Sequence, residues 1–315
     1  MRGALVSLLL ICMLVGPGAA DPSSADTLVD GCGATVAGRG YLAADLDCTG
    51  YDGPAVHLFS KSVLDLAGFT ISGGLSDAVV CEGRCEVEGR GGTITGAARN
   101  GISIRGRTFE ARDLIVSHNG RAGIFDASEA DPAAFGNRTR ARLERVTLTS
   151  NGRQGVLAKQ VEFEGTAHLN GMSGVRCWRK CRIRNSSCRA NGFQGVSGGG
   201  RSRIDVEGSV IAENLDYGIG NARRVRLRDS FVFWNWTAGV RAKNVRASDS
   251  TLFENNFSPT CDEGAVCADL VTTRKPRLEA TDCDRSALEK IVKGGLISDI
   301  GYPHVLNPWG VCLLD

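Results

Sequence analysis

The sequence predicts an all-β protein, a parallel β-helix (solenoid) of about nine coils with disulfide-bonded caps at both ends. Three observations predict this fold. A motif centred on Gly-Val or Gly-Ile recurs about every 21 to 23 residues, short runs of alternating apolar and polar residues fill each repeat, and 41 of the 315 residues are glycine. A fixed period of this length is typical of repeat proteins, and period-two alternation indicates strands.

The overall composition fits a folded, exported protein. Hydrophobic residues make up 42% of the chain, which is enough to form a core and argues against global disorder. Only 8 residues are proline, so a collagen-like or proline-rich chain is excluded. The formal net charge of +2 indicates no strongly charged partner by itself. The 12 cysteines are many for a cytosolic protein.

The first 20 residues have the pattern of a secretory signal peptide. Arg2 precedes an apolar run from Leu5 to Val15, and Gly18 and Ala20 are the small residues expected before cleavage ahead of residue 21. The apolar run is too short to span a membrane, and no later stretch is long and apolar enough. We therefore expect a secreted or periplasmic protein without a membrane span.

The repeat extends over residues 55–258 and defines columns of equivalent positions. The central pairs begin at Ala55, Ala78, Gly101, Gly123, Gly155, Gly174, Gly195, Gly218 and Gly239. An asparagine stands four residues before most of them, at Asn119, Asn151, Asn170, Asn191, Asn214 and Asn235, and begins a last, truncated turn at Asn255. Three residues before each asparagine stands an apolar or small residue, namely Val116, Leu148, Ala167, Cys188, Ile211, Val232 and Leu252, and Ile71 and Ile94 continue this column backwards.

Stacking of the coils roughly 4.8 Å apart would turn each column into a ladder along the solenoid. The asparagines are then expected to form a structural ladder of amides at one turn, and the apolar column is expected to face the core. Glycine is expected to supply the positive φ that the tight turns need.

The repeat Asn119-Gly120-Arg121-Ala122-Gly123-Ile124 resembles the coils of right-handed parallel β-helix proteins of the pectin-lyase-like superfamily, in particular secreted bacterial proteins with N-G-x-x-G-[IV] coils. Shorter motifs in the flanks, Asp45-Leu46-Asp47-Cys48 and Trp309-Gly310-Val311-Cys312, also look like those of family caps. The resemblance implies a right-handed solenoid. It also implies a polysaccharide partner, because many members bind or cleave acidic glycans, but it supplies no catalytic residues.

The segments 21–54 and 259–315 are expected to cap the open strand edges of the solenoid, with a short helix near Ser286–Lys293 in the second cap.

The cysteine positions favour five disulfides. These are Cys32–Cys48 in the first cap, Cys81–Cys85 and Cys177–Cys181 as local clips, and Cys261–Cys267 with Cys283–Cys312 in the second cap. Cys188 remains and is expected to be a buried, inert thiol. A zinc site is the rival explanation, but neither CxxxC pair has a nearby histidine, so we predict no metal and no cofactor.

Two columns of outward charges run along the predicted coils. One contains Glu110, Arg142, Glu162, Arg182, Asp205, Arg226 and Arg246, and its neighbour contains Arg112, Glu144, Glu164, Arg184, Glu207 and Arg228. Opposite charges stacked in this way indicate a solvated salt-bridge face.

The adjacent pair Glu144 and Glu164 interrupts the alternation, close to a loop at about residues 127–141. These carboxylates are candidates for an acid/base pair or part of a cation site. Alternatively, Arg112 and Arg184 neutralise them.

A second feature, which we call the basic ridge, follows the first strand of the coils. Its residues are Arg105, Arg107, Lys159, Arg179, Lys180, Arg201, Arg223, Arg224 and Lys243. Stacked cations repel one another, so the ridge is either simply solvated or neutralised by an anionic polymer. Trp178, Trp234 and Trp236 fall on turns, where they either stack on sugar rings or join neighbouring coils by hydrophobic contact.

The leading functional hypothesis is an exported β-helix that binds an anionic or neutral polysaccharide without a strong catalytic signature. Nucleic acid is disfavoured as a partner because the chain carries an export signal. The alternatives are a polysaccharide lyase or glycoside hydrolase and a non-catalytic structural surface protein. No nucleophile elbow, HExxH, P-loop or dinucleotide motif occurs. The stretch Tyr217-Gly218-Ile219-Gly220 begins like the alginate-epimerase motif but lacks its Asp-Pro-His.

Overall fold

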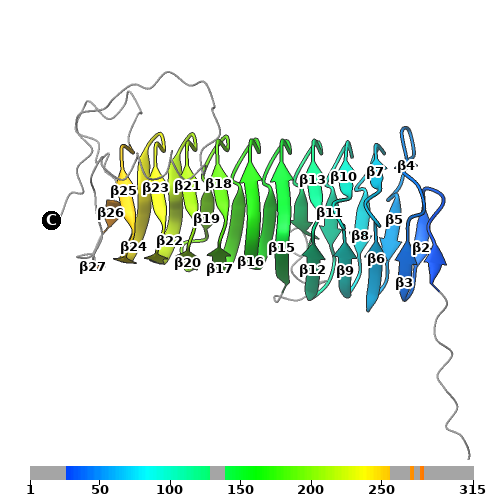
Figure 1. Cartoon of the computed structure of the whole chain (residues 1–315), viewed down its shortest axis with the longest axis horizontal. Helices are drawn as coiled ribbons and strands as arrows, with labels where there is room; N and C mark the ends of the chain where they lie inside the picture. The colour runs from blue at the N-terminus through cyan, green and yellow to red at the C-terminus, as the bar shows by residue number, and fades with distance from the viewer. Residues whose placement is uncertain (1–25, 128–138, 256–269, 273–276, 280–315) are drawn as a thin grey trace, which may run out of the picture.

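The computed structural model describes residues 26–127, 139–255, 270–272 and 277–279. In this part of the chain 27 strands build a parallel β-solenoid of about ten coils, and no helix is present (Figure 1). Every strand pairing between coils is parallel, as in Ile102↔Ile124 and Phe109↔Ala141. The predicted fold class is therefore confirmed.

Each coil contributes three strands, which form a first, a second and a third sheet along the solenoid. The first sheet contains β2 (Ala34–Val36), β5 (Val56–Leu58), β8 (Val79–Cys81), β11 (Ile102–Ile104), β14 (Ile124–Asp126), β19 (Val196–Gly198) and β26 (Leu270–Thr272). The second contains β1 (Thr27–Leu28), β3 (Arg39–Tyr41), β6 (Ser62–Asp65), β9 (Arg84–Glu88), β12 (Thr108–Arg112), β20 (Arg203–Glu207) and β27 (Arg277–Glu279). The third contains β4 (Leu46–Asp47), β7 (Thr70–Ser72), β10 (Thr93–Thr95), β13 (Ile115–Ser117), β18 (Ser187–Arg189), β21 (Val210–Ala212), β23 (Phe231–Phe233) and β25 (Thr251–Phe253).

Five longer strands continue round at least one corner and so belong to more than one sheet. They are β15 (Arg140–Thr149), β16 (Val156–His168), β17 (Val175–Arg184), β22 (Tyr217–Arg228) and β24 (Ala238–Ser248). The first corner joins the first and second strands of a coil, and the second corner joins the second and third strands. The asparagine corner joins the third strand to the next coil.

The alternation of the sequence decides which side chains fill the solenoid. In β12, for example, Phe109 and Ala111 are buried whereas Arg112 is exposed, because successive side chains of a strand point to opposite faces. The predicted inward column pairs from coil to coil, as in Ile94↔Val116 and Cys188↔Ile211. All of its members are buried, which confirms the core assignment.

The asparagine ladder is structural, as predicted. Each side-chain amide donates to the carbonyl oxygen of the next asparagine: Asn119 to Asn151 at 2.9 Å, Asn151 to Asn170 at 3.0 Å, Asn170 to Asn191 at 3.0 Å, Asn191 to Asn214 at 2.9 Å, Asn214 to Asn235 at 2.8 Å and Asn235 to Asn255 at 2.7 Å. These side chains are buried and also bond to the backbone of the preceding third strands. The ladder therefore satisfies polar groups inside the turn.

The glycines of the asparagine corner have a different purpose from the one expected. At this corner the residue with positive φ is the one directly before the asparagine position. That residue is Gly96 in an early coil, but it is His118 (52°) and Leu169 (54°) in later coils. A Cβ atom on Gly123 would lie 2.7 Å from the carbonyl oxygen of Gly155 in the next coil. These glycines are therefore needed because adjacent backbones approach closely, and the prediction that they supply positive φ was wrong for them.

The described cysteines agree with the predicted pairing. Disulfides join Cys32 to Cys48, Cys81 to Cys85 and Cys177 to Cys181. Cys188 is a buried free thiol, and its burial raises its pKa to about 12, so it stays protonated and unreactive. The predicted pairs Cys261–Cys267 and Cys283–Cys312 and the predicted helix near Ser286–Lys293 lie outside the described residues.

The segment expected to form the first cap contains a coil of the solenoid. Strand β2 pairs with β5, β3 with β6, and β4 with β7, all in parallel register. The Cys32–Cys48 disulfide joins the start of this coil to its end. The regular stack therefore begins before residue 55, and β1 adds one more short strand beside β3.

Candidate functional site

The basic ridge lies at one corner of the solenoid. Most of its residues occupy the first corner, between the first and second strands of successive coils, and Lys180 and Arg224 stand where the second strands begin. Most of them are exposed, and Lys159 and Lys180 are half-buried. Burial, and to a lesser extent the charge of nearby Arg179, lowers the pKa of Lys159. The segment 128–138, which contains most of the expected loop, follows β14 in the sequence and lies outside the described residues.

The second sheet continues the ridge with further cations. Its outward column nearest the ridge pairs Lys180↔Arg203 and Arg203↔Arg224. The next column pairs Arg182↔Asp205, Asp205↔Arg226 and Arg226↔Arg246, in the register that the sequence predicted. The ridge and this face were expected to be separate features. They are instead neighbouring columns of one surface.

A depression of about 160 Å³ opens on this surface. It is lined by Arg182, Ile183, Arg184, Arg203, Asp205, Val206, Glu207, Arg226 and Arg228. Five arginines and two carboxylates line it, so the side chains leave an excess of three positive charges. Arginine presents several N–H donors in a planar group that matches carboxylates, sulfates and phosphates.

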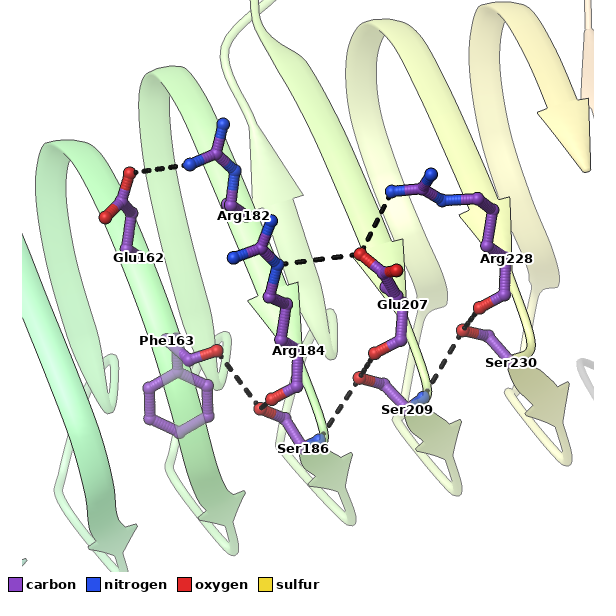
Figure 2. A network of polar contacts seen from close by, with 9 residues as sticks. All are labelled: Glu162, Phe163, Arg182, Arg184, Ser186, Glu207, Ser209, Arg228 and Ser230. Atoms are coloured by element: carbon purple, nitrogen blue, oxygen red, sulfur yellow. Dashed lines mark hydrogen bonds and ion pairs between the residues drawn. The ribbon is translucent and has the colours of Figure 1, made fainter.

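Both carboxylates of the depression form ion pairs with its arginines, and those of Glu207 are drawn in Figure 2. Glu207 lies 3.5 Å from Arg184 and 2.9 Å from Arg228, so one carboxylate is shared by two guanidinium groups. Asp205 accepts a hydrogen bond from Arg203 at 2.9 Å. Arg226 lies between these pairs and has no ion-pair partner among the described residues. Its donors are available to a ligand.

A ladder of buried serines holds the backbone beneath these arginines. Backbone N–H groups of Ser186 and Ser209 donate to the hydroxyls of Ser209 and Ser230 in the next coil, at 3.1 and 3.3 Å. The Ser209 hydroxyl in turn donates to the carbonyl of Glu207 at 2.7 Å, and the Ser230 hydroxyl donates to that of Arg228 at 2.6 Å (Figure 2). The sequence interpretation missed this ladder, although these serines recur at the period of the coils.

The boundary of the basic surface is Glu162. Its carboxylate lies 2.8 Å from Arg140, 3.3 Å from Arg142 and 3.0 Å from Arg182. Burial acts to raise the pKa of this carboxyl, but the hydrogen bonds from Arg140 and Arg142 and the charge of Arg182 outweigh burial and lower the pKa. Glu162 is therefore held ionised between two groups of arginines.

The candidate pair Glu144 and Glu164 does occupy paired positions on neighbouring coils. Glu144 forms an ion pair with Arg145 and lies 3.9 Å from Arg112, whereas Arg184 pairs with Glu207. Neither glutamate lines the depression at Arg203 and Arg226. Its ion pairs give Glu144 the surroundings of a surface salt bridge, and a catalytic role for the pair stays a prediction.

The three tryptophans have different surroundings. Trp234 donates from its indole N–H to Glu254 at 2.8 Å and packs edge-on against Phe233. The guanidinium of Arg176 lies 4.4 Å from the centre of the Trp178 ring. These two rings pack within the turns, whereas Trp236 is 42% exposed and is the tryptophan best placed to meet a ligand.

No group of three or more His, Cys, Asp or Glu side chains suited to a metal ion occurs in the described ranges. The same ranges contain no helix that is long and apolar enough to cross a membrane. Comparison of the chain with protein-family models, with curated proteins and with solved structures found no match in any of the three.

Proposed function

We propose that this protein is an exported, non-catalytic β-helix that binds an anionic polysaccharide along the basic ridge and the adjoining part of the second sheet. The observation that carries the proposal is the depression at Arg203, Arg226 and Arg228, where five arginines face two carboxylates. An excess of cations held on a rigid sheet favours an anionic ligand.

The shape of the surface favours a linear polymer over a small anion. Equivalent cations recur from coil to coil, at a spacing of roughly 4.8 Å set by parallel strand pairing. The depression lies on the outward face of the second sheet, along which the columns of donors continue from coil to coil, so its donors form part of a track. The disulfides are typical of an oxidising compartment, where extracellular glycans rather than nucleic acids are the abundant polyanions.

Replacement of the three arginines tests the proposal. The triple variant Arg203→Gln, Arg226→Gln, Arg228→Gln should bind immobilised polygalacturonate or heparin about 10 to 100 times more weakly, at ~0.5–1 kcal/mol per lost contact. Binding of the wild-type protein should also weaken steeply as salt increases.

The matched control removes the same charge from the same sheet. Arg84, Arg112 and Arg142 lie in the corresponding columns nearer the N-terminus, beside more carboxylates. Their change to Gln should alter affinity by less than threefold. Equal losses in the two triple variants, or no binding of either polymer by the wild-type protein, would contradict the proposed site.

Turnover assays test the non-catalytic part of the proposal. Release of reducing ends or unsaturated products from polygalacturonate by the wild-type protein, abolished by Glu144→Gln or Glu164→Gln, would favour a lyase or hydrolase instead. The expected result is that all three proteins leave the polymer intact.

A further inference from the structure

A second column of cations stands on the asparagine corner, away from the second sheet. Arg99, Arg121 and Arg153 occupy equivalent positions in three successive coils and are all exposed. The backbone N–H of Arg121 donates to the carbonyl of Arg99 at 2.8 Å, and that of Arg153 donates to Arg121 at 3.0 Å. We call these residues the arginine ladder. Strand-like stacking places successive members roughly 4.8 Å apart.

The arginine ladder differs from the charged columns of the second sheet in having no carboxylates. None of its three side chains forms an ion pair with any residue that the structure describes. The equivalent position is Ser76 in the preceding coil and Met172 and Phe193 in the following two, so the nearest acid in the column is Asp216, three coils beyond Arg153. Like charges stacked in neighbouring coils repel, and a bound polyanion would relieve that repulsion.

Bare backbone lies beside the arginine ladder. Exposed Gly120 and Gly152 directly precede Arg121 and Arg153. A Cβ atom on either glycine would lie 2.4 Å from a carbonyl oxygen of the preceding coil, so a side chain is sterically excluded there. The guanidinium groups therefore stand along one side of a strip without side chains, over which a polymer can lie.

Exposed apolar side chains continue the same corner toward the C-terminus. Phe193 is 42% exposed, Leu215 56% and Trp236 42%. Backbone hydrogen bonds join Arg153 to Met172 and Met172 to Phe193, so the apolar side chains follow the arginines directly along the corner. Aromatic and aliphatic side chains pack against the faces of sugar rings, which favours a glycan over a polyanion without rings, such as polyphosphate.

We propose that the arginine ladder and the adjoining apolar side chains form a second glycan-binding track, so that one molecule bridges two chains of an anionic polysaccharide. The inference rests on the proposed function for its first track. In the coil, the asparagine corner lies between the third and first sheets and hence across from the second sheet (Figure 1). The two tracks therefore face different directions, and one short chain cannot occupy both.

The stoichiometry of binding tests this bridging. Titration calorimetry with a short oligogalacturonate should give two chains per wild-type protein. It should give one chain for the ladder variant (Arg99→Gln, Arg121→Gln, Arg153→Gln) and one for the sheet variant (Arg203→Gln, Arg226→Gln, Arg228→Gln). The control Arg84→Gln, Arg112→Gln, Arg142→Gln should keep two. Long polygalacturonate should scatter light strongly when mixed with the wild-type protein, and at least tenfold less with the ladder or the sheet variant.

A second pair of substitutions separates ring contacts from charge. Phe193→Ser with Trp236→Ser, made in the sheet variant, should weaken binding of oligogalacturonate severalfold and leave binding of polyphosphate unchanged. Equal losses for both probes would contradict a role for the apolar side chains. The substituted residues are exposed except for Arg203 and Arg226, which are half-buried, so thermal unfolding should be unchanged and is measured for each variant to confirm that it is folded.

The outcomes distinguish the two proposals. One chain per wild-type protein, lost entirely in the sheet variant, would overturn the second track and leave the proposed function standing. Binding unchanged in the sheet variant but lost in the ladder variant would overturn the proposed site and keep the arginine ladder. If the wild-type protein binds neither oligogalacturonate nor heparin, both proposals fail.

Discussion

The N-terminal and C-terminal parts of the second sheet share one backbone and one core but carry opposite surfaces. In β6, β9 and β12 the outward charged residues are four acids and two arginines, namely Asp65, Glu86, Glu88, Glu110, Arg84 and Arg112. In the equivalent parts of β17, β20, β22 and β24, eight of the outward charged residues are basic and two are acidic. They are Lys180, Arg182, Arg184, Arg203, Arg224, Arg226, Arg228 and Arg246, with Asp205 and Glu207.

The comparison shows how a repeat fold separates stability from recognition. In the N-terminal part the carboxylates are paired, and Arg39 lies 3.0 Å from Asp65 and 2.9 Å from Glu88. These two hydrogen bonds raise the pKa of the Arg39 guanidinium. In the C-terminal part cations are in excess. The inward side chains are apolar in both parts, so the outward columns can change charge without disturbing the core.

The largest expected effect concerns the asparagine ladder, which both parts share. Asn119→Ala in the N-terminal part and Asn214→Ala in the C-terminal part each leave buried neighbours without hydrogen-bond partners. Each change should lower the free energy of unfolding by about 3 kcal/mol, because unsatisfied buried polar groups cost ~1–3 kcal/mol each. Chemical denaturation measures the loss. A large effect at only one position would show that the two parts differ in their internal architecture as well as in surface charge.

A smaller effect is expected on ligand affinity, where the two parts differ in charge. Glu207→Gln removes one of the two carboxylates of the depression, and with it the charge shared by Arg184 and Arg228. Affinity for polygalacturonate should increase severalfold, while stability falls by less than about 1 kcal/mol because the ion pairs are exposed. Binding measured at several salt concentrations tests this. Glu88→Gln in the N-terminal part is the control, and an equal gain there would argue against a localised site.

The smallest effect concerns Glu162, at the boundary between the two parts. Because its pKa is lowered in the folded protein, it stabilises the fold above the ordinary value of 4.5, and this contribution is lost as pH falls through the folded pKa. Glu162→Gln should therefore lower stability near neutral pH by a few tenths of a kcal/mol after solvent screening, and the difference should vanish in acid. Unfolding curves across this pH range provide the measurement. Glu164→Gln should show a smaller difference, and a Glu162 effect that grew in acid would contradict the assignment.

Much of the fold follows from the period of the sequence. In a solenoid the contacts between coils repeat at one sequence separation, so aligning the repeats predicts the asparagine ladder, the inward column and the charge columns together. The clips at Cys81–Cys85 and Cys177–Cys181 were predictable for the same reason, since both pairs fall at one turn of the repeat.

The candidate site was only partly predictable. The sequence indicated the basic ridge and the charge columns, but it did not show that Lys180, Arg203 and Arg224 join them into one surface. It also missed Arg145 as the partner of Glu144. The pairing of β15 with β16 shifts by one residue between Glu144 and Val146. Positive φ recurs at the position of Arg145, as at Asp113 and Asp229, but the spacing of residues does not show where the end of its long side chain meets Glu144.

The sequence by itself determined which residues stack, because stacking in a parallel solenoid is a matter of period. Only the tertiary structure decided which columns lie beside each other, which carboxylates are already paired and where glycine is needed for close approach of two backbones. These properties depend on how each corner turns and on where the ends of long charged side chains meet. Neither is fixed by the spacing of residues along the chain.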